Sequence, residues 1–351
     1  MSKEDKIKNF NPNSIGDINN NIFGLPFTVE EASVILIPVP WDVTVSYSAG
    51  TSNAPESIFN ASLQVDLFDA YIDNAWKIGI AMDEIPSEII ELNKKLRTLS
   101  DEYINFLANG GDLNSSEQMK SVVSTINEGS FLLNNFVKDK SKFYLDKGKI
   151  VGVIGGEHSV PYGLFLALAE KYDSFGILQI DAHADLRDSY EDFEFSHASI
   201  MYNATKISQI SKIVQIGIRD YCEDEYNLIK NSNNRIKTFF DKDIKHELYE
   251  GNIWKSIVEN IIAELPQNLY ISFDIDGLDP KLCPNTGTPV PGGLELEQVF
   301  YIFEKISESG KKIIGFDLNE VGTSENEWDE SVAARIIYKL ANISAKTQGI
   351  I

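Results

Sequence analysis

Short apolar runs alternate with segments of helical spacing from Lys149 onward, and this alternation restricts the fold more than any other feature of the chain. Apolar runs rich in β-branched residues occur at 150–154, 175–180, 212–216, 236–240, 269–273 and 312–316. Near-continuous apolar runs of this length are typical of strands that are buried on both faces. Because helical segments fit between several of them, the pattern predicts a mostly parallel sheet covered on both sides, which is a three-layer α/β/α fold.

The chain before Lys149 adds a strand, a helical segment and an arm. Residues 33–40 form another apolar run, closed by prolines, and are predicted to be the first strand. Residues 87–148 have helical spacing with a polar interruption, which predicts two helices packed on the main sheet. Residues 1–27 are polar and rich in Asn, so we expect an extended N-terminal arm, outside the core, that could wrap a neighbouring subunit. A single domain is expected over residues 28–351.

Composition and charge exclude several classes of function. No apolar run approaches the roughly 20 residues of a membrane span, and the N-terminus has no signal-peptide pattern, so we expect a cytoplasmic protein without a membrane partner. Cys222 and Cys283 are too few for a disulfide framework or a cysteine-based zinc site. The 31 basic and 53 acidic residues give a formal net charge of -22, which would repel nucleic acid and attract small cations.

Histidine and aspartate gather at the predicted ends of strands. Three of the four histidines, His158, His183 and His197, lie within one short stretch of the chain. His158 follows the strand at 150–154, and ligands of open α/β sheets bind at the carboxyl ends of strands. Asp181 and Asp185 flank His183 at a spacing of two, so an extended backbone would place these three side chains on one face.

Asp274 and Asp276 repeat the same spacing after the strand predicted at 269–273. Four aspartates gathered in one buried place would repel one another, so one or two divalent cations are the natural means of neutralising them. The number of N and O ligands suits two ions, and a set without thiolate favours Mn, Fe, Ni, Co or Zn.

Each of these motifs has a simpler structural interpretation when it is taken alone. Gly155-Gly156 lacks the rest of a phosphate-binding motif and is more simply a turn at the end of a strand. An isolated Asp-X-Asp is commonly a turn, and a lone histidine at a strand end is commonly structural. The three motifs together favour a metal site.

Four blocks of the sequence resemble the signature blocks of the ureohydrolase family, which includes arginases, agmatinases, guanidinobutyrases and guanidine hydrolases. They are Gly-Gly-Glu-His-Ser (155–159), Asp-Ala-His-Ala-Asp (181–185), Ser-His-Ala (196–198) and Ser-Phe-Asp-Ile-Asp-Gly-Leu-Asp-Pro (272–280). The resemblance extends over about residues 34–343, and residues 185–188 are more similar to the agmatinase branch than to arginases. It implies an arginase-like fold, a homo-oligomer (hexamer or trimer) and a small cationic guanidino substrate.

The resemblance also implies roles for individual residues. Asp181 and Asp274 would bridge two divalent ions, with Mn²⁺ the first choice and Ni²⁺ if the enzyme is a guanidine hydrolase. Hydroxide generated there would attack the guanidinium carbon and release urea. Asp185 would orient the hydroxide, His197 would carry a proton to the leaving nitrogen, and Glu320 would contact the guanidinium group. The complete implied ligand set is His158, Asp181, His183, Asp185, Asp274 and Asp276.

Two tryptophans decide which substrate the sequence favours. Trp41 and Trp328 lie in loops near the predicted site, and a small aromatic pocket would suit free guanidine through cation-π contacts. Agmatine would need a longer channel with an acceptor for its far amine, so guanidine is the favoured substrate, with agmatine or guanidinobutyrate as alternatives. Both tryptophans could instead be core or interface residues.

Glu157 stands where many members of the resembled family have Asp, a change that should leave the metal ligands intact but could alter the contacts behind them. Two other classes of protein remain open, a zinc deacetylase-like enzyme and a non-catalytic binding protein. Neither would be expected to keep the full two-metal ligand set together with His197.

Overall fold

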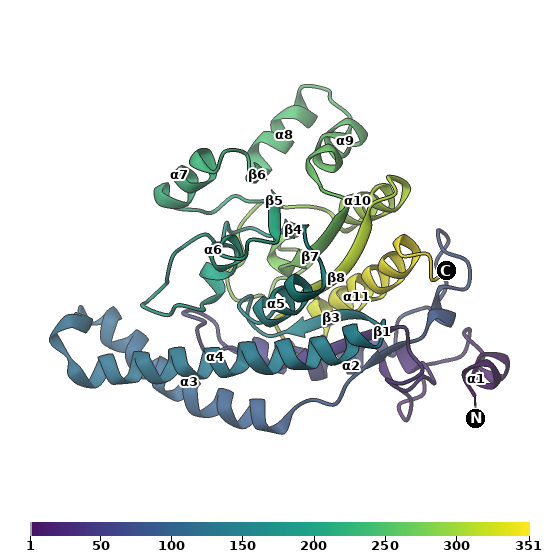
Figure 1. Cartoon of the computed structure of the whole chain (residues 1–351), viewed down its shortest axis with the longest axis horizontal. Helices are drawn as coiled ribbons and strands as arrows, with labels where there is room; N and C mark the ends of the chain where they lie inside the picture. Colours follow the sequence, from purple (N-terminus) through teal and green to yellow (C-terminus); the bar gives the residue numbers. More distant parts are fainter. Residues whose placement is uncertain (1) are drawn as a thin grey trace.

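A computed structural model, which describes residues 2–351, contains one eight-stranded sheet (Figure 1). Its strands are β1 (Val34–Val39), β2 (Ile80–Met82), β3 (Ile150–Gly155), β4 (Phe175–Ile180), β5 (Ile210–Ile216), β6 (Ile236–Phe239), β7 (Asn268–Phe273) and β8 (Lys312–Leu318). They lie in the order β2-β1-β3-β8-β7-β4-β5-β6, and every neighbouring pair is parallel. The predicted parallel sheet is confirmed.

Helices cover both faces of the sheet, because right-handed crossovers place a helix on one face or the other according to the direction in which the chain moves across the sheet. One layer contains α2 (Ala54–Ser62), α9 (Trp254–Glu264), α10 (Leu296–Glu308) and α11 (Trp328–Thr347). In this layer α2 packs on α11, α11 on α10, and α10 on α9. The other contains α4 (Glu117–Asp146), α5 (Tyr162–Lys171) and α6 (Ile200–Thr205). The short helices α7 (Glu223–Asn231) and α8 (Asp241–Tyr249) lie near the β6 edge (Figure 1). The three-layer prediction is confirmed.

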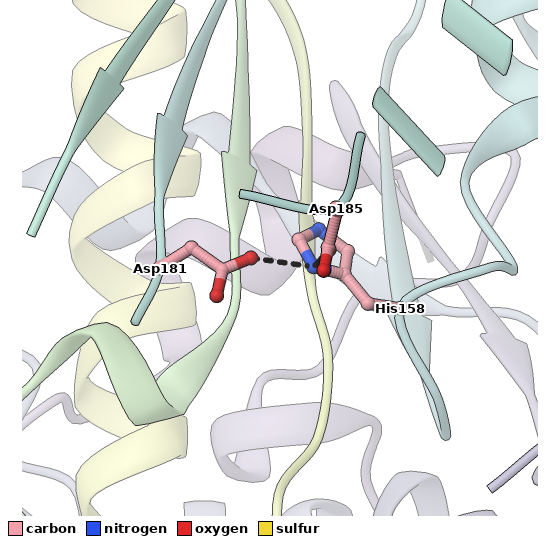
Figure 2. Close-up of side chains that lie close together, drawn as sticks. All are labelled: His158, Asp181 and Asp185. Atoms are coloured by element: carbon pink, nitrogen blue, oxygen red, sulfur yellow. Dashed lines mark ion pairs between the residues drawn. The ribbon is translucent and has the colours of Figure 1, made fainter. Parts of the chain in front are cut away.

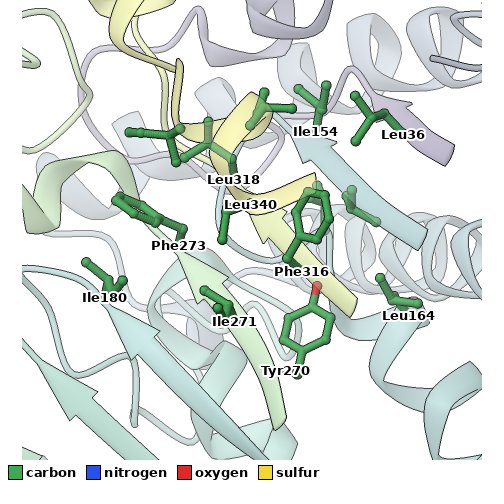
Figure 3. Close-up of a cluster of buried hydrophobic side chains, with 14 of the residues drawn as sticks. Leu36, Ile154, Leu164, Ile180, Tyr270, Ile271, Phe273, Phe316, Leu318 and Leu340 are labelled. Atoms are coloured by element: carbon green, nitrogen blue, oxygen red, sulfur yellow. The ribbon is translucent and has the colours of Figure 1, made fainter. Parts of the chain in front are cut away.

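The core lies on both sides of the central strands. All six residues of β1, β3 and β4 are buried, as the unbroken apolar runs of the sequence indicate. Figure 3 shows Phe273 and Phe316 among the aliphatic side chains of this core. A Cβ on Gly152 would lie 2.5 Å from the Phe316 ring, so only glycine leaves room for that ring against β3.

The helical segment before β3 is a hairpin of two long helices, as predicted. α3 (Ser87–Ala108) begins directly after Pro86, and α4 begins after Ser116, whose hydroxyl accepts the backbone N–H of Met119 at 3.3 Å. α4 packs on α5, β1 and β3, and α3 packs on α4 from outside (Figure 1). α3 therefore forms an additional outer layer.

Residues 2–27 differ from the extended arm that the sequence predicts. A short helix, α1 (Lys3–Asn9), opens the chain, and its Lys3 ammonium donates to the carbonyl of Ile78 at 2.6 Å. Phe23 and Phe27 are buried in the core, and Phe23 meets Tyr338 edge to face with ring centroids 5.1 Å apart. Scattered apolar residues in this polar stretch are too few for a periodic pattern, yet they are sufficient to anchor it.

No helix within residues 2–351 combines the length and the apolar character that crossing a membrane requires.

Candidate metal and catalytic site

The four central strands of the sheet, β3, β8, β7 and β4, place the predicted site residues at one edge. His158 follows β3, Asp181 follows β4, Asp274 follows β7 and Glu320 follows β8. Because these strands are neighbours and all parallel, their carboxyl ends converge. Segments far apart in the sequence therefore deliver their polar residues to one place.

The first group of side chains surrounds Nδ1 of His158 (Figure 2). Carboxylate oxygens of Asp181, Asp185 and Asp274 lie 3.0, 3.1 and 3.3 Å from this nitrogen. All four residues are buried. Three carboxylates facing one imidazole nitrogen without intervening protein atoms form a natural cation site.

A second group shares one residue with the first. Nδ1 of His183 lies 3.0 Å from Oδ2 of Asp276 and 3.7 Å from Oδ1 of Asp181. Asp181 therefore belongs to both groups, as a bridging ligand would. Asp274 lies with the first group, and its Oδ1 accepts the backbone N–H of Asp276 at 2.9 Å.

Local backbone geometry explains how Asp185 reaches the cluster. Its φ of 54° is in the left-handed region, so the extended backbone considered for residues 181–185 does not persist. Its carbonyl oxygen accepts the N–H groups of Met201 and Tyr202 at 3.0 and 3.1 Å, which hold the turn in place. Asp181, His183 and Asp185 still converge, through a turn instead of an extended strand.

Burial and like charge disturb the pKa values of the cluster. Burial, followed by the neighbouring charge of Asp181, raises the pKa of Asp185 to about 8. Burial and the charge of Asp276 raise the pKa of Asp274 well above its usual value. Burial acts to lower the pKa of His183, but the charges of Asp276 and Asp181 outweigh it and raise this pKa to about 12. The cluster thus holds more negative charge than it can keep without a cation.

Two buried atoms test whether the residues fit metal ions. Nδ1 of His158 and Oδ2 of Asp276 have no hydrogen-bond partner within residues 2–351. Nε2 of His158 instead contacts Ser272 Oγ at 2.9 Å, and this hydroxyl donates to Asp317 at 2.9 Å. Nε2–H is therefore donated to Ser272, and Nδ1 faces the carboxylates. Although burial acts to lower the pKa of this ring, the negative charge of these carboxylates raises it well above its usual value. Loss of the Nδ1 proton would leave the tautomer that a metal ligand needs. The N and O donors fit divalent ions.

A cavity of about 200 Å³ opens over the cluster. Four of the predicted ligands line it, namely His158, His183, Asp185 and Asp274. His197 and Glu320 line it as well, so both predicted non-ligand residues reach the same cavity. Further from the cluster its wall consists of Ser46, Arg187, Tyr190, Ala198, Asp220, Tyr221, Glu225 and Thr288.

Glu320 presents one carboxylate oxygen to the cavity. Its Oε1 accepts the backbone N–H of His158 at 2.8 Å, and its own backbone N–H donates to the Gly156 carbonyl at 2.7 Å. A φ of 60° puts this residue in the left-handed region, which these two bonds sustain. Burial and the charge of Glu157 raise the pKa of Glu320 well above its usual value. A cationic group in the cavity would reverse that effect.

His197 lies in the cavity wall, at the start of a 3-10 turn (His197–Ser199). Desolvation lowers the pKa of His197 to about 4, and the positive rings of His183 and His158 act in the same direction. Its ring is therefore neutral near pH 7. Its Nδ1 faces Thr44 Oγ1 at 3.4 Å.

The structure does not bring Trp41 and Trp328 to the cavity, which corrects the aromatic pocket expected from the sequence. Trp41 is fully buried in the core, and its backbone packs against Gly156. Trp328 is 46% exposed at the start of α11, and its indole N–H donates to the Lys281 carbonyl at 2.9 Å. The cavity aromatics are Tyr190 and Tyr221 instead.

Sequence reasoning did not identify the residues that support the site. Ser272 lies inside the block at 272–280, and Asp317 lies on β8. A polar residue within an otherwise apolar buried strand is the signal that could have identified both. Three others lie on α3, where Asn93 and Arg97 bond the loop at 42–45, and Tyr103 bonds Asp192. No local pattern in the sequence connects a helix to loops this distant.

Comparison with known proteins gives one family. A sequence model of the Arginase family matches residues 32–342. An N(1)-aminopropylagmatine ureohydrolase of Thermus thermophilus is 27% identical over 320 residues, covering 91% of this chain and 93% of the relative. An agmatinase of Bacillus anthracis is 26% identical over 305 residues, covering 87% and 89%.

Solved structures share the fold. The agmatine ureohydrolase of Thermoplasma volcanium superposes with a TM-score of 0.69 at 24% identity, over 99% of each chain. The proclavaminate amidino hydrolase of Streptomyces clavuligerus has a TM-score of 0.69 at 20% identity, covering 95% of this chain and 99% of that one.

Proposed function

The chain belongs to the arginase family and is a ureohydrolase, a hydrolase of C–N bonds, and from this premise we propose that it uses two divalent ions to release urea from a cationic guanidino compound. The observation that carries the proposal is the pair of overlapping ligand groups that share Asp181 beneath the cavity. A zinc deacetylase-like enzyme would need only one such group.

Six residues would hold the ions. His158, Asp181, Asp185 and Asp274 form one group, and His183 and Asp276 complete the other with Asp181. When bound, the ions supply Lewis acidity that generates hydroxide from water at neutral pH. We propose Mn²⁺ for this role, with Ni²⁺ if free guanidine is the substrate.

The remaining chemistry belongs to side chains in the cavity wall. The free oxygen of Glu320 would accept guanidinium N–H groups and orient the planar cation. Asp185 would orient the attacking hydroxide. After attack at the guanidinium carbon, a C–N bond breaks. His197 would first take up at its ring a proton lost by the attacking group, and would then pass it to the departing nitrogen. The products are urea and an amine, or urea and ammonia when guanidine itself is cleaved.

For the substrate we propose an alkylguanidine of the agmatine type, with free guanidine as the second candidate. The cavity extends beyond the ligands to Asp220, an exposed carboxylate that could accept the far amine. The named relatives act on agmatine or its aminopropyl derivative. Free guanidine keeps support from Tyr190, whose ring lies in the wall edge to face with His197 at a centroid distance of 5.7 Å.

The test measures urea release by protein loaded with Mn²⁺ or with Ni²⁺. The substrates are agmatine, aminopropylagmatine, guanidinobutyrate, arginine and guanidine. Agmatine-type substrates should have the highest kcat/KM. Asp220→Asn should lower kcat/KM for agmatine by roughly tenfold or more and leave guanidine within about twofold. If guanidine has the highest kcat/KM, the second candidate replaces the first. If no compound yields urea, the proposed reaction is wrong.

We further propose that the protein is a cytoplasmic homo-oligomer, a hexamer or trimer. Light scattering of the purified protein tests the assembly, and a monomeric mass would contradict it.

A further inference from the structure

Glu157 is a buried carboxylate that the proposed chemistry does not use. It directly precedes His158 and is fully buried, yet it belongs to neither group of candidate ligands. Its oxygens accept from the backbone N–H of Thr44 at 2.7 Å, from the Thr44 hydroxyl at 2.8 Å and from the Ser159 hydroxyl at 2.5 Å. The carboxylate therefore faces the loop after β1.

The Thr44 hydroxyl connects this carboxylate to His197. Thr44 Oγ1 accepts the backbone N–H of His197 at 3.1 Å and lies 3.4 Å from Nδ1 of its ring. A hydroxyl has one proton and two lone pairs. Its proton is directed to Glu157, so both contacts with His197 must be donated by the histidine.

We propose that Glu157 and Thr44 act as positioning residues that fix the ring orientation and tautomer of His197. With Nδ1–H donated to Thr44, the neutral ring keeps its lone pair on Nε2. That nitrogen is then the one that exchanges a proton with the reacting groups. The inference rests on the proposed role of His197 in the same cavity.

The geometry also explains why a glutamate suits this position. One oxygen accepts a hydrogen bond from the Thr44 hydroxyl, and the other accepts one from the Thr44 backbone N–H, so the carboxylate binds this residue at two points. A side chain one methylene shorter would lose one of the two bonds unless the loop moved. These two hydrogen bonds keep the Thr44 hydroxyl from rotating and donating its proton to His197.

The experiment compares Thr44→Val with Thr44→Ser in metal-loaded protein. Valine keeps the shape of threonine without the hydroxyl, so kcat should fall roughly 10- to 100-fold with KM and metal content within about twofold. Serine restores the hydroxyl and should keep kcat within about threefold of the wild type. Thr51→Val is the matched control, since Thr51 is buried in the same loop region with a hydroxyl that has no hydrogen-bond partner within residues 2–351.

Nitrogen-15 NMR of histidine-labelled protein, loaded with diamagnetic Zn²⁺, reports the tautomer directly, because the chain has only four histidines. The wild type and Thr44→Ser should show His197 as the Nδ1–H tautomer, and Thr44→Val should shift it toward Nε2–H. An Nε2–H tautomer in the wild type would overturn the inference. A wild-type kcat in Thr44→Val, or a fall in kcat in Thr44→Ser as large as that in Thr44→Val, would overturn it as well. If the wild type releases no urea, the proposed function is wrong. The NMR measurement of the His197 tautomer still tests whether Glu157 and Thr44 position that ring.

Discussion

At the scale of single residues, the site depends on contacts behind the ligands. Ser272 Oγ accepts a hydrogen bond from Nε2–H of His158 and donates one to Asp317, which also accepts the backbone N–H of Phe273 at 3.0 Å. Burial raises the pKa of Asp317 to about 6, so it is ionised at neutral pH despite its surroundings. This chain of bonds keeps Nδ1 facing the candidate metal site.

Ser272→Ala should therefore weaken metal binding by roughly 10- to 100-fold, because His158 loses the partner that holds its tautomer and ring plane. Competition with a chelator of known affinity measures the change. Ser100→Ala removes a buried hydroxyl that has no partner within residues 2–351, and it should leave metal affinity unchanged. Equal affinities for Ser272→Ala and the wild type would contradict this role.

His197→Ala should lower kcat by roughly 10²- to 10⁴-fold without changing metal content, because a positioned acid and base contributes about that much to a rate. Steady-state urea release together with metal analysis measures both quantities. His246 on α8 lies outside the cavity lining, so His246→Ala is the control and should retain wild-type kcat. A His197→Ala protein with normal kcat would remove the proposed proton carrier.

At the scale of elements, helix α3 bonds two loops that border the candidate site. Nη1 of Arg97 donates to the carbonyls of Asp42 and Val43 at 3.0 and 3.2 Å, in the loop that carries Thr44. The Tyr103 hydroxyl donates to Asp192 in the loop that carries His197. An outer-layer helix therefore fixes the distance between the two sides of the cavity.

Arg97→Met should lower kcat/KM by roughly tenfold or more, since small displacements of positioned groups are costly in rate. Amide hydrogen exchange should become faster in residues 42–50, while the sheet keeps its protection. Lys95→Met alters an exposed residue of the same helix and serves as the control. If Arg97→Met matches that control in both measurements, α3 does not position the loop.

The elements themselves could be predicted from the sequence where apolar periodicity was strong. Seven strands and the α3–α4 hairpin follow from it, whereas β2 was missed because Ile80–Met82 is too short to form a pattern. The candidate ligands could be listed from the sequence because they follow strand ends at short spacing, and the structure brings them together. The roles of Trp41 and Thr44 could not be predicted. Both lie in the loop after β1, and only its packing against distant loops places Trp41 in the core and the Thr44 hydroxyl beside His197.

At the scale of the whole molecule, four neighbouring parallel strands gather negative charge at one edge of the sheet, and we propose that divalent cations balance it. In the metal-free protein the carboxyl of Asp185, with a pKa of about 8, and the ring of His183, with a pKa of about 12, carry protons at pH 7. A metal ligand must lose its proton. Metal binding and proton release are therefore coupled.

Binding of Mn²⁺ at pH 7 should release more than one proton per chain, and affinity should rise with pH because fewer protons then compete. Isothermal titration in buffers of different ionisation enthalpy gives the number of protons released. Affinity independent of pH between about 6 and 8, with no proton release, would show that the ligands bind in another protonation state.

The most direct measurement is urea release from agmatine as metal-free protein is titrated with Mn²⁺. Activity should rise from near zero and reach its plateau at two equivalents per chain, and Asp181→Asn should abolish it because Asp181 is shared by both ligand groups. A plateau at one equivalent, or urea release that does not depend on metal, would contradict a two-metal ureohydrolase.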